Sequence, residues 1–250
     1  MADSSQQDLQ EKVWVVIPAA GIGKRMQSEI PKQYIKIQGK TILEHTLDCF
    51  IHHPQIAGCM VALASEDPYW KSLSIHATAS DFPLYTVEGG DQRSDSVEQA
   101  LDYLSVVEKL AEDSWVMVHD AARPCLSQHD ITRLLSVITE GASGGILASP
   151  VRDTMKRAKQ GELVILQTES RDDLWHALTP QLFKLGELTE ALEYCIENGL
   201  TVTDEASAME ARGYTVKLVE GDSSNIKVTR PADIELATWL LSQKGKANET

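Results

Sequence analysis

Short apolar runs alternate with segments of helical periodicity over the first 151 residues of the chain. Apolar runs without polar alternation are typical of strands buried on both faces, and they occur at residues 13–19, 59–64, 115–121 and 144–151. Apolar residues at helical spacing predict helices at residues 41–53, 94–110 and 128–140. This order predicts a Rossmann-like α/β fold with a mostly parallel sheet and helices on both of its faces.

The alternation breaks down at about residues 152–182, where short apolar runs are mixed with charges and a glycine turn. We expect an inserted β-arm there, projecting from the sheet. A helix at residues 184–198, a strand at 215–221 and a helix at 231–243 complete the pattern. No repeat or linker interrupts it, so we expect a single domain over residues 12–244, with flexible tails at residues 1–11 and 245–250.

The charge balance narrows the class of ligand. The 250 residues carry a net charge of −14, which argues against broad nucleic-acid binding. An acidic protein that binds an anion must gather its cations locally, and residues 24–40 contain five Lys or Arg against Glu29 alone. An apolar content of 42% is enough for a sizeable core.

The cysteines and the N-terminal stretch indicate the cellular compartment of the protein. The four cysteines are scattered without a CxxC pair, which indicates reduced thiols and neither a disulfide framework nor a zinc site. The polar N-terminal stretch lacks the apolar segment of a signal peptide, and no apolar run approaches the ~18 residues of a membrane span. We therefore expect a soluble, cytoplasmic protein.

The first strand leads into the loop PAAGIGKRM, followed by PKQ. Gly21 and Gly23 let backbone N–H groups approach phosphate oxygens, because no Cβ intervenes. The loop is not a Walker motif, and Met26 stands where the third glycine of GxGxxG would be. An ordinary turn explains the glycines equally well, but Arg25 and Lys32 supply more cation than a turn needs and favour a polyphosphate site.

Two further segments follow predicted strands. EGGDQRSDS offers glycines for a loop that recognises a base or a ribose, although Ser94 or Asp95 also suits a simple helix N-cap. VHDAARP places Asp120 and Arg123 at a strand end, where side chains commonly face a ligand or its metal. A buried ion pair between these two residues is the alternative, and His119 is expected to be structural.

The arm and the C-terminal third carry weaker signals. The charges of the arm suit a solvated hairpin or a dimer contact, and Asp172 and Asp173 offer Arg171 a plain surface pair. Thr203 and Asp204 indicate a helix capping box. Lys227 stands alone in its segment, and a single lysine is little evidence for a binding site.

Taken in order, these segments resemble one family. PAAGxGxRM with PKQ, GGDxRxDSV, VHDAARP, PVRDTMKR, LWxALTPQ, TDEASAxE and NIKVTRPxD span roughly residues 13–240. The series resembles the 2-C-methyl-D-erythritol 4-phosphate cytidylyltransferases of the non-mevalonate isoprenoid pathway. Other cytidylyltransferases, such as the ribitol-5-phosphate enzymes, are the nearest alternatives. The chain ends soon after the last motif, so we expect no fused cyclodiphosphate synthase.

The resemblance implies a reaction, a cofactor and an assembly. CMP would pass from CTP to methylerythritol 4-phosphate with release of pyrophosphate. Mg²⁺ would be required and held mainly by the CTP phosphates, so its protein ligands stay unknown. The family assembles as a homodimer in which the β-arm is exchanged between subunits.

The resemblance also implies roles for residues. Arg25 and Lys32 match the pair that stabilises the transition state, and Arg171 and Lys227 match the residues that position the substrate phosphate. The nucleotide side comprises Pro18, Ala19, Ala20, Gly21, Gly23, Lys32, Gly90, Asp91, Ser96, Asp120 and Ala121. The substrate side comprises Asp120, Arg123, Thr154, Arg171, Thr179, Thr203 and Lys227.

The implied chemistry suits these residue types. A phosphate monoester oxygen is already anionic, so its attack on the α-phosphorus needs positioning and cations more than a general base. Two rival functions remain at this point. One is a nucleotide-binding regulator with the same pocket, and the other is an NAD dehydrogenase, which the missing third glycine disfavours.

Overall fold

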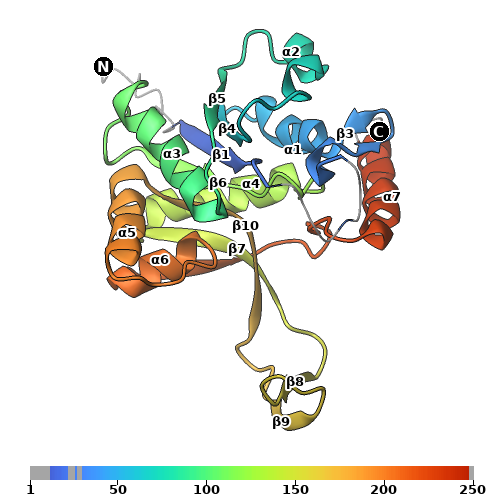
Figure 1. The fold of residues 1–250 in the computed structure, drawn as a ribbon, viewed down its shortest axis with the longest axis vertical. Helices are drawn as coiled ribbons and strands as arrows, with labels where there is room; N and C mark the ends of the chain where they lie inside the picture. The colour runs from blue at the N-terminus through green and yellow to red at the C-terminus, as the bar shows by residue number, and fades with distance from the viewer. Residues whose placement is uncertain (1–11, 22–25, 27–29, 248–250) are drawn as a thin grey trace, which may run out of the picture.

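The computed structural model describes residues 12–21, 26 and 30–247, and a seven-stranded sheet forms its centre (Figure 1). The strands lie in the order β11-β7-β10-β6-β1-β4-β5. Their bounds are β1 Val13–Pro18, β4 Ile56–Leu63, β5 Leu84–Glu88, β6 Trp115–Val118, β7 Gly144–Pro150, β10 Trp175–Lys184 and β11 Val216–Glu220. Strand β10 runs antiparallel to both of its neighbours, and the other pairs are parallel. The predicted α/β fold with a mostly parallel sheet is confirmed.

Helices cover both faces of this sheet, as predicted (Figure 1). Val15 and Ile17 of β1 belong to one buried cluster with α1 (Ile42–Ile51) and α4 (Gln128–Leu135). Val16 points to the opposite face, into the cluster of α3 (Arg93–Val106), α5 (Leu185–Glu197) and α6 (Glu205–Arg212). The run of apolar residues in β1 therefore supplies both cores, because successive side chains of a strand point to opposite faces.

A smaller layer closes one end of the molecule. It contains the 3₁₀ helix η2 (Lys32–Tyr34), the hairpin of β2 (Lys36–Ile37) and β3 (Lys40–Thr41), and α7 (Pro231–Ala247). Ile37, Val228 and Ala237 form its buried core. The remaining short elements are η3 (Trp70–Ser72), α2 (Ile75–Thr78) and η4 (Ser136–Glu140). In the described part of the chain, no helix is long and apolar enough to cross a bilayer.

The inserted arm extends well away from the body and ends in the hairpin of β8 (Met155–Ala158) and β9 (Ile165–Glu169) (Figure 1). It is shorter than the predicted 152–182. Residues 178–183 of β10 are buried, and residues 181–184 of that strand pair with β6 in the main sheet. The end of the arm was predicted too late because β10 begins in the exposed arm and ends in the core. Its run of apolar residues therefore looks short and irregular in the sequence.

Several helix boundaries also differ from the prediction: the helix predicted at 94–110 ends at Val106, and the helix predicted at 41–53 ends at Ile51. The helix predicted at 128–140 ends at Leu135, and the 3₁₀ helix η4 follows it to Glu140. Helix α7 continues to Ala247, into the stretch predicted as a tail from residue 245. The predicted N-terminal tail, residues 1–11, lies outside the described residues.

Candidate functional site

A cavity of about 280 Å³ opens where β1, β5 and β6 end. The chain leaves β1 to build β4 and β5 on one side of it, then returns to build β6 on the other side. Ligands of open α/β sheets bind at such a reversal of strand order, beyond the carboxyl ends of the strands. The cavity therefore lies where the topology predicts a ligand.

Most of the residues predicted for nucleotide binding meet in this cavity. Its lining includes Pro18, Ala19, Ala20, Gly21, Lys32, Gly90, Asp91, Ser96, Asp120 and Ala121, together with Lys227. Gly23 and Arg25 lie outside the described residues. The lining also contains Gln33, Gln92, Arg93 and Ala122, which the sequence reasoning did not select.

Gln33 holds the backbone of the first loop in place. Its buried side-chain amide donates a hydrogen bond to the carbonyl oxygen of Ala19 at 2.6 Å, and the N–H of Ala19 donates to Ala62 at 2.8 Å. Lys32, the residue before Gln33, places its Nζ 3.4 Å from the carbonyl oxygen of Val228. A side chain buried beside the loop thus fixes the backbone that leads to Gly21, while the neighbouring cation faces the cavity.

The loop of residues 89–92, which follows β5, needs Gly89 because it closely approaches Ala20 in the first loop, the one that follows β1. A Cβ on Gly89 would lie 2.7 Å from the Cβ of Ala20 and 2.7 Å from the Oγ of Ser96. Gly90 donates its N–H to Ser96 Oγ at 3.2 Å, so Ser96 of α3 holds the loop that precedes its helix. The helix that follows has Gln92 as its N-cap, two or three residues before the predicted Ser94 or Asp95.

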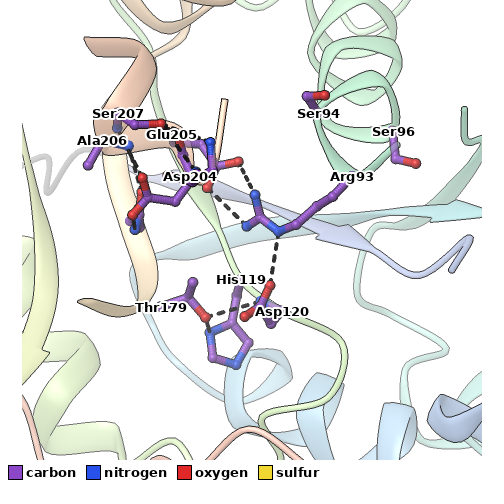
Figure 2. Close-up of polar contacts among 12 residues, drawn as sticks. Arg93, Ser94, Ser96, His119, Asp120, Thr179, Asp204, Glu205, Ala206 and Ser207 are labelled. Carbon is purple, nitrogen blue, oxygen red and sulfur yellow. Dashed lines mark hydrogen bonds and ion pairs between the residues drawn. The ribbon is translucent and has the colours of Figure 1, made fainter. Parts of the chain in front are cut away.

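Asp120 is the electrostatic centre of the cavity wall (Figure 2). Its Oδ1 accepts from Arg93 Nε at 3.0 Å, and its Oδ2 lies 3.2 Å from Arg123 Nε and 2.9 Å from Lys227 Nζ. Burial alone raises the pKa of this carboxyl, but the three cations outweigh burial and hold the pKa well below its usual range. Asp120 therefore stays ionised and serves as an anchor for cations, not as a general acid.

Arg93 joins Asp120 to a second, fully buried carboxylate (Figure 2). Its two terminal nitrogens donate to the oxygens of Glu205 at 2.5 Å and 3.0 Å. Burial lowers the pKa of Arg93, but Glu205 and Asp120 raise it above its ordinary value. The motifs GGDxRxDSV and TDEASAxE contained both residues, but 112 positions separate them and no local pattern pairs them.

Behind Asp120 lies a buried layer that does not reach the cavity lining. Arg123 pairs with Asp120 and donates to the carbonyl of Asn225 at 2.7 Å, which is the buried ion pair weighed as the alternative for this motif. Thr179 accepts from the N–H of Asp120 at 3.1 Å and contacts His119 Nδ1 at 3.0 Å. Burial lowers the pKa of His119 to about 4, so this histidine is neutral and structural, as expected.

Three further residues predicted to bind the substrate lie outside the lining of this cavity. Thr154 and Arg171 are exposed on the arm, where Arg171 donates to the carbonyl of Arg152. Neither Asp172 nor Asp173 forms an ion pair with Arg171 in the described arm. Thr203 is exposed before α6.

The expected capping box before α6 is present. Asp204 is the N-cap of α6, and its partner in the box is Ser207, whose N–H it accepts at 3.0 Å. The exposed Thr203 donates its own N–H to Ser207 Oγ at 3.1 Å, so this segment is held by local turn contacts. The contacts of Thr203 and Asp204 within this chain are therefore those of a helix N-terminus.

The cavity suits an anionic ligand. Lys32, Arg93 and Lys227 lie in its wall beside glycine-containing loops whose backbone is held from behind. Among the described residues, no three His, Cys, Asp or Glu side chains gather as a metal site. Cations and fixed backbone dipoles are what phosphoryl-group chemistry uses for positioning and charge stabilisation.

Comparisons with known proteins agree on one family. The family model described as 2-C-methyl-D-erythritol 4-phosphate cytidylyltransferase (IspD) matches residues 13–243. A protein of that name from Alteromonas mediterranea is 49% identical over 237 residues, covering 94% of this chain and 95% of the relative. Another from Vibrio parahaemolyticus is 50% identical over 229 residues, covering 92% of this chain and 95% of the relative.

Solved structures give the same result for the fold. The Francisella tularensis 2-C-methyl-D-erythritol 4-phosphate cytidylyltransferase matches with a TM-score of 0.77 at 39% identity, over 92% of this chain and 100% of that one. A 4-diphosphocytidyl-2C-methyl-D-erythritol synthase matches with a TM-score of 0.79 at 37% identity, over 93% of this chain and 99% of that one.

Proposed function

Because the chain belongs to the 2-C-methyl-D-erythritol 4-phosphate cytidylyltransferase family, we propose how the residues of its cavity carry out the family's reaction. The enzyme transfers CMP from CTP to 2-C-methyl-D-erythritol 4-phosphate in isoprenoid precursor biosynthesis. The products are 4-diphosphocytidyl-2-C-methyl-D-erythritol and pyrophosphate. The observation that carries the assignment of roles is the meeting of both glycine loops, Lys32 and Lys227 in one cavity.

The nucleotide occupies the side of the cavity formed by the two loops. Backbone groups of residues 19–21 contact the triphosphate, and Gly90, Asp91 and Ser96 contact the cytidine. This placement is supported by the tight contact between the loops, which leaves room for backbone approach only while residue 89 lacks a Cβ. Asp120 and Ala121 complete the lining opposite the second loop.

The reaction is an in-line displacement at the α-phosphorus of CTP. The attacking oxygen belongs to an anionic phosphate monoester, so the barrier is mainly repulsion between like charges and the charge that grows on the α-phosphate. Lys32 lies in the cavity wall and stabilises that charge, together with Arg25, which lies outside the described residues. Lys227 holds the phosphate of the acceptor, since this residue lines the cavity while Asp120 anchors its Nζ at 2.9 Å.

Mg²⁺ is the proposed cofactor, held mainly by phosphate oxygens of CTP. Asp120 is a poor ligand for a metal because three cations already occupy its carboxylate. Asp91 is the other carboxylate in the described cavity wall. Magnesium ions commonly take one or two carboxylates plus substrate phosphates, which this donor set fits. The bound ion would offset the phosphates' negative charge.

A homodimer through the arm is the proposed assembly. The arm carries exposed apolar side chains that its own fold leaves uncovered, namely Met155, Leu163, Val164, Ile165 and Leu166. An apolar patch of this kind at the surface typically marks a protein–protein contact. Thr154 and Arg171 lie on the same arm and line no part of their own chain's cavity. Insertion of the arm into a second copy would bring these two residues to the acceptor side of that copy's cavity.

A cytoplasmic location is also proposed. All four cysteines are buried thiols, as in proteins kept in a reducing compartment.

The direct test of the function is pyrophosphate release from CTP and Mg²⁺, with methylerythritol 4-phosphate and ribitol 5-phosphate as parallel acceptors. We expect release with the first acceptor. Release with ribitol 5-phosphate alone would overturn the acceptor and keep the mechanism. Binding of CTP without pyrophosphate release in the presence of either acceptor would support a nucleotide-binding regulator.

A further inference from the structure

Arg93 occupies a junction between three segments that are distant in sequence. It is the first residue of α3, directly after the loop of residues 89–92, while Glu205 is the first residue of α6 and Asp120 follows β6. The side chain of Arg93 is 29% exposed and lines the cavity, whereas that of Glu205 is 1% exposed. Figure 2 shows the guanidinium between the two carboxylates.

The contacts use the geometry that only arginine has. Two terminal nitrogens bind Glu205 at 2.5 Å and 3.0 Å, while Nε binds Asp120 at 3.0 Å. A planar guanidinium offers donors in a fixed fork, whereas the ammonium of a lysine is a single point charge that would not span both carboxylates. Glu205 therefore fixes the rotation of the guanidinium, and the guanidinium fixes the Oδ1 edge of Asp120.

Fixing one oxygen of Asp120 determines what the other can do. With Oδ1 held by Arg93, Oδ2 remains for Arg123 and Lys227. A carboxylate that could rotate would offer Lys227 a range of positions, and misplacing a positioning group by a small distance is costly in group transfer. Without Glu205, the positive charge of Arg93 would lack its buried partner and would compete with Lys227 for Asp120 or for a phosphate.

The same side chain connects the two halves of the cavity. The loop before α3 is the proposed cytidine side, and Asp120 with Lys227 is the proposed acceptor side. A change in the loop on nucleotide binding would reach Asp120 through Arg93, since no other described residue forms ion pairs with both Asp120 and Glu205.

We propose that Glu205 and Arg93 are positioning residues for the acceptor: Glu205 orients Arg93, and Arg93 orients Asp120 so that Lys227 meets the acceptor phosphate. This role rests on the proposed function of the cavity and adds two residues to it. Neither residue needs to touch the reacting atoms. Their loss is therefore expected to act on the use of the acceptor more than on the binding of CTP.

The test compares E205Q, R93Q and the double variant with wild type and with E190Q. Glu190 of α5 is a matched control, because it pairs at 2.5 Å with Arg212 of α6, the helix that Glu205 begins, and is exposed outside the cavity. Initial rates of pyrophosphate release give kcat/KM for methylerythritol 4-phosphate, calorimetry gives the Kd of CTP, and thermal denaturation gives Tm.

We expect E205Q to lower kcat/KM for the acceptor by roughly tenfold and R93Q by roughly a hundredfold, with the Kd of CTP within about threefold of wild type. Since Glu205 acts through Arg93, the double variant should match R93Q within about twofold. E190Q should leave all three quantities unchanged. An unchanged acceptor kcat/KM in E205Q, even with a lower Tm, would reduce the pair to a structural contact. Multiplying effects in the double variant would also overturn the proposal, because Glu205 would then act independently of Arg93.

A spectroscopic measurement decides the question without activity. The ¹⁵N-attached Nε–H of Arg93, assigned by its loss in R93K, should exchange slowly in wild type and rapidly in E205Q. Fast exchange in wild type would refute the arrangement, even if E205Q or R93Q failed to fold. Wild type that released no pyrophosphate would contradict the function instead, and this signal would still decide whether Glu205 holds the guanidinium of Arg93.

Discussion

His119 should make the stability of this enzyme depend on pH in a mildly acidic range. The imidazole is fully buried and both of its nitrogens are engaged, Nε2 with the carbonyl of Arg123 at 3.1 Å and Nδ1 with the hydroxyl of Thr179 at 3.0 Å. The carbonyl of Arg123 can only accept, so the neutral imidazole carries its hydrogen on Nε2, and Nδ1 accepts the hydrogen of the Thr179 hydroxyl, which in turn accepts from the N–H of Asp120. A proton on Nδ1 would break this chain of hydrogen bonds.

The magnitude follows from the pKa. Burial lowers the pKa of His119 from 6.5 to about 4. Since the unfolded chain binds the proton first, the stabilisation is complete above the unfolded pKa and is lost as the pH falls toward the folded pKa. At ~1.4 kcal/mol per pH unit the full effect is about 3 kcal/mol, of which about 2 kcal/mol is lost between about pH 7 and pH 5.

Urea denaturation at several pH values measures this loss. Wild type should lose about 2 kcal/mol more free energy of unfolding between about pH 7 and pH 5 than H119N, which lacks the titrating group. The matched control is H129N, because His129 is exposed and should keep the pH dependence of wild type. An NMR titration of the Cε1–H of His119 in the folded protein gives the pKa directly. A pKa near 6.5 for that signal, or equal pH slopes in wild type and H119N, would refute the reasoning.

Three further predictions concern the cavity and the arm. K32A should lower turnover by ~10²–10³ with a smaller effect on CTP binding, since we propose that Lys32 acts where charge grows in the transition state; single-turnover rates and CTP titration separate the two. G89A should raise the Kd of CTP by roughly tenfold, because its Cβ would lie 2.7 Å from Ala20 and force the two loops apart; calorimetry measures it. L163D should lower the molecular mass found by light scattering from that of the proposed dimer to that of a monomer, because it places a charge on the exposed apolar arm.

Each of these variants has a control elsewhere in the molecule. K36A removes an exposed lysine outside the cavity lining, G221A places a Cβ 3.4 Å from its nearest neighbour, and V106D adds a charge at an exposed valine of α3. All three should behave as wild type in the corresponding assay. Wild-type turnover in K32A, wild-type CTP affinity in G89A, or an unchanged mass in L163D would contradict the respective argument.

Much of the fold could be predicted from local pattern. Unbroken apolar runs such as residues 13–19 indicate strands buried on both faces, and the alternation with helices implies parallel pairing. The exception is β10, whose first residues lie in the arm and whose last residues are buried. Its place between β6 and β7 depends on pairing with strands far away in sequence, which periodicity does not report.

The side of the cavity proposed for the nucleotide was predictable because its residues come from contiguous loops at strand ends. Gly21, Gly90 and Asp120 each follow a strand, and parallel strands bring their carboxyl ends to one edge. The order of motifs also identified the family, since a whole series is far more specific than any one glycine loop. Local sequence was thus enough for the family, the fold class and the loops that face the ligand.

Only the tertiary structure decided which charged residues share an environment. Asp120 binds Arg93, Arg123 and Lys227, yet Arg123 lies in the buried layer behind the cavity and Lys227 lines the cavity. Glu205 looks like an ordinary first-turn acid of a helix until the fold places it against Arg93. The physical reason is that electrostatic coupling depends on distance and burial in three dimensions, and folding brings together charges that the chain keeps 112 residues apart.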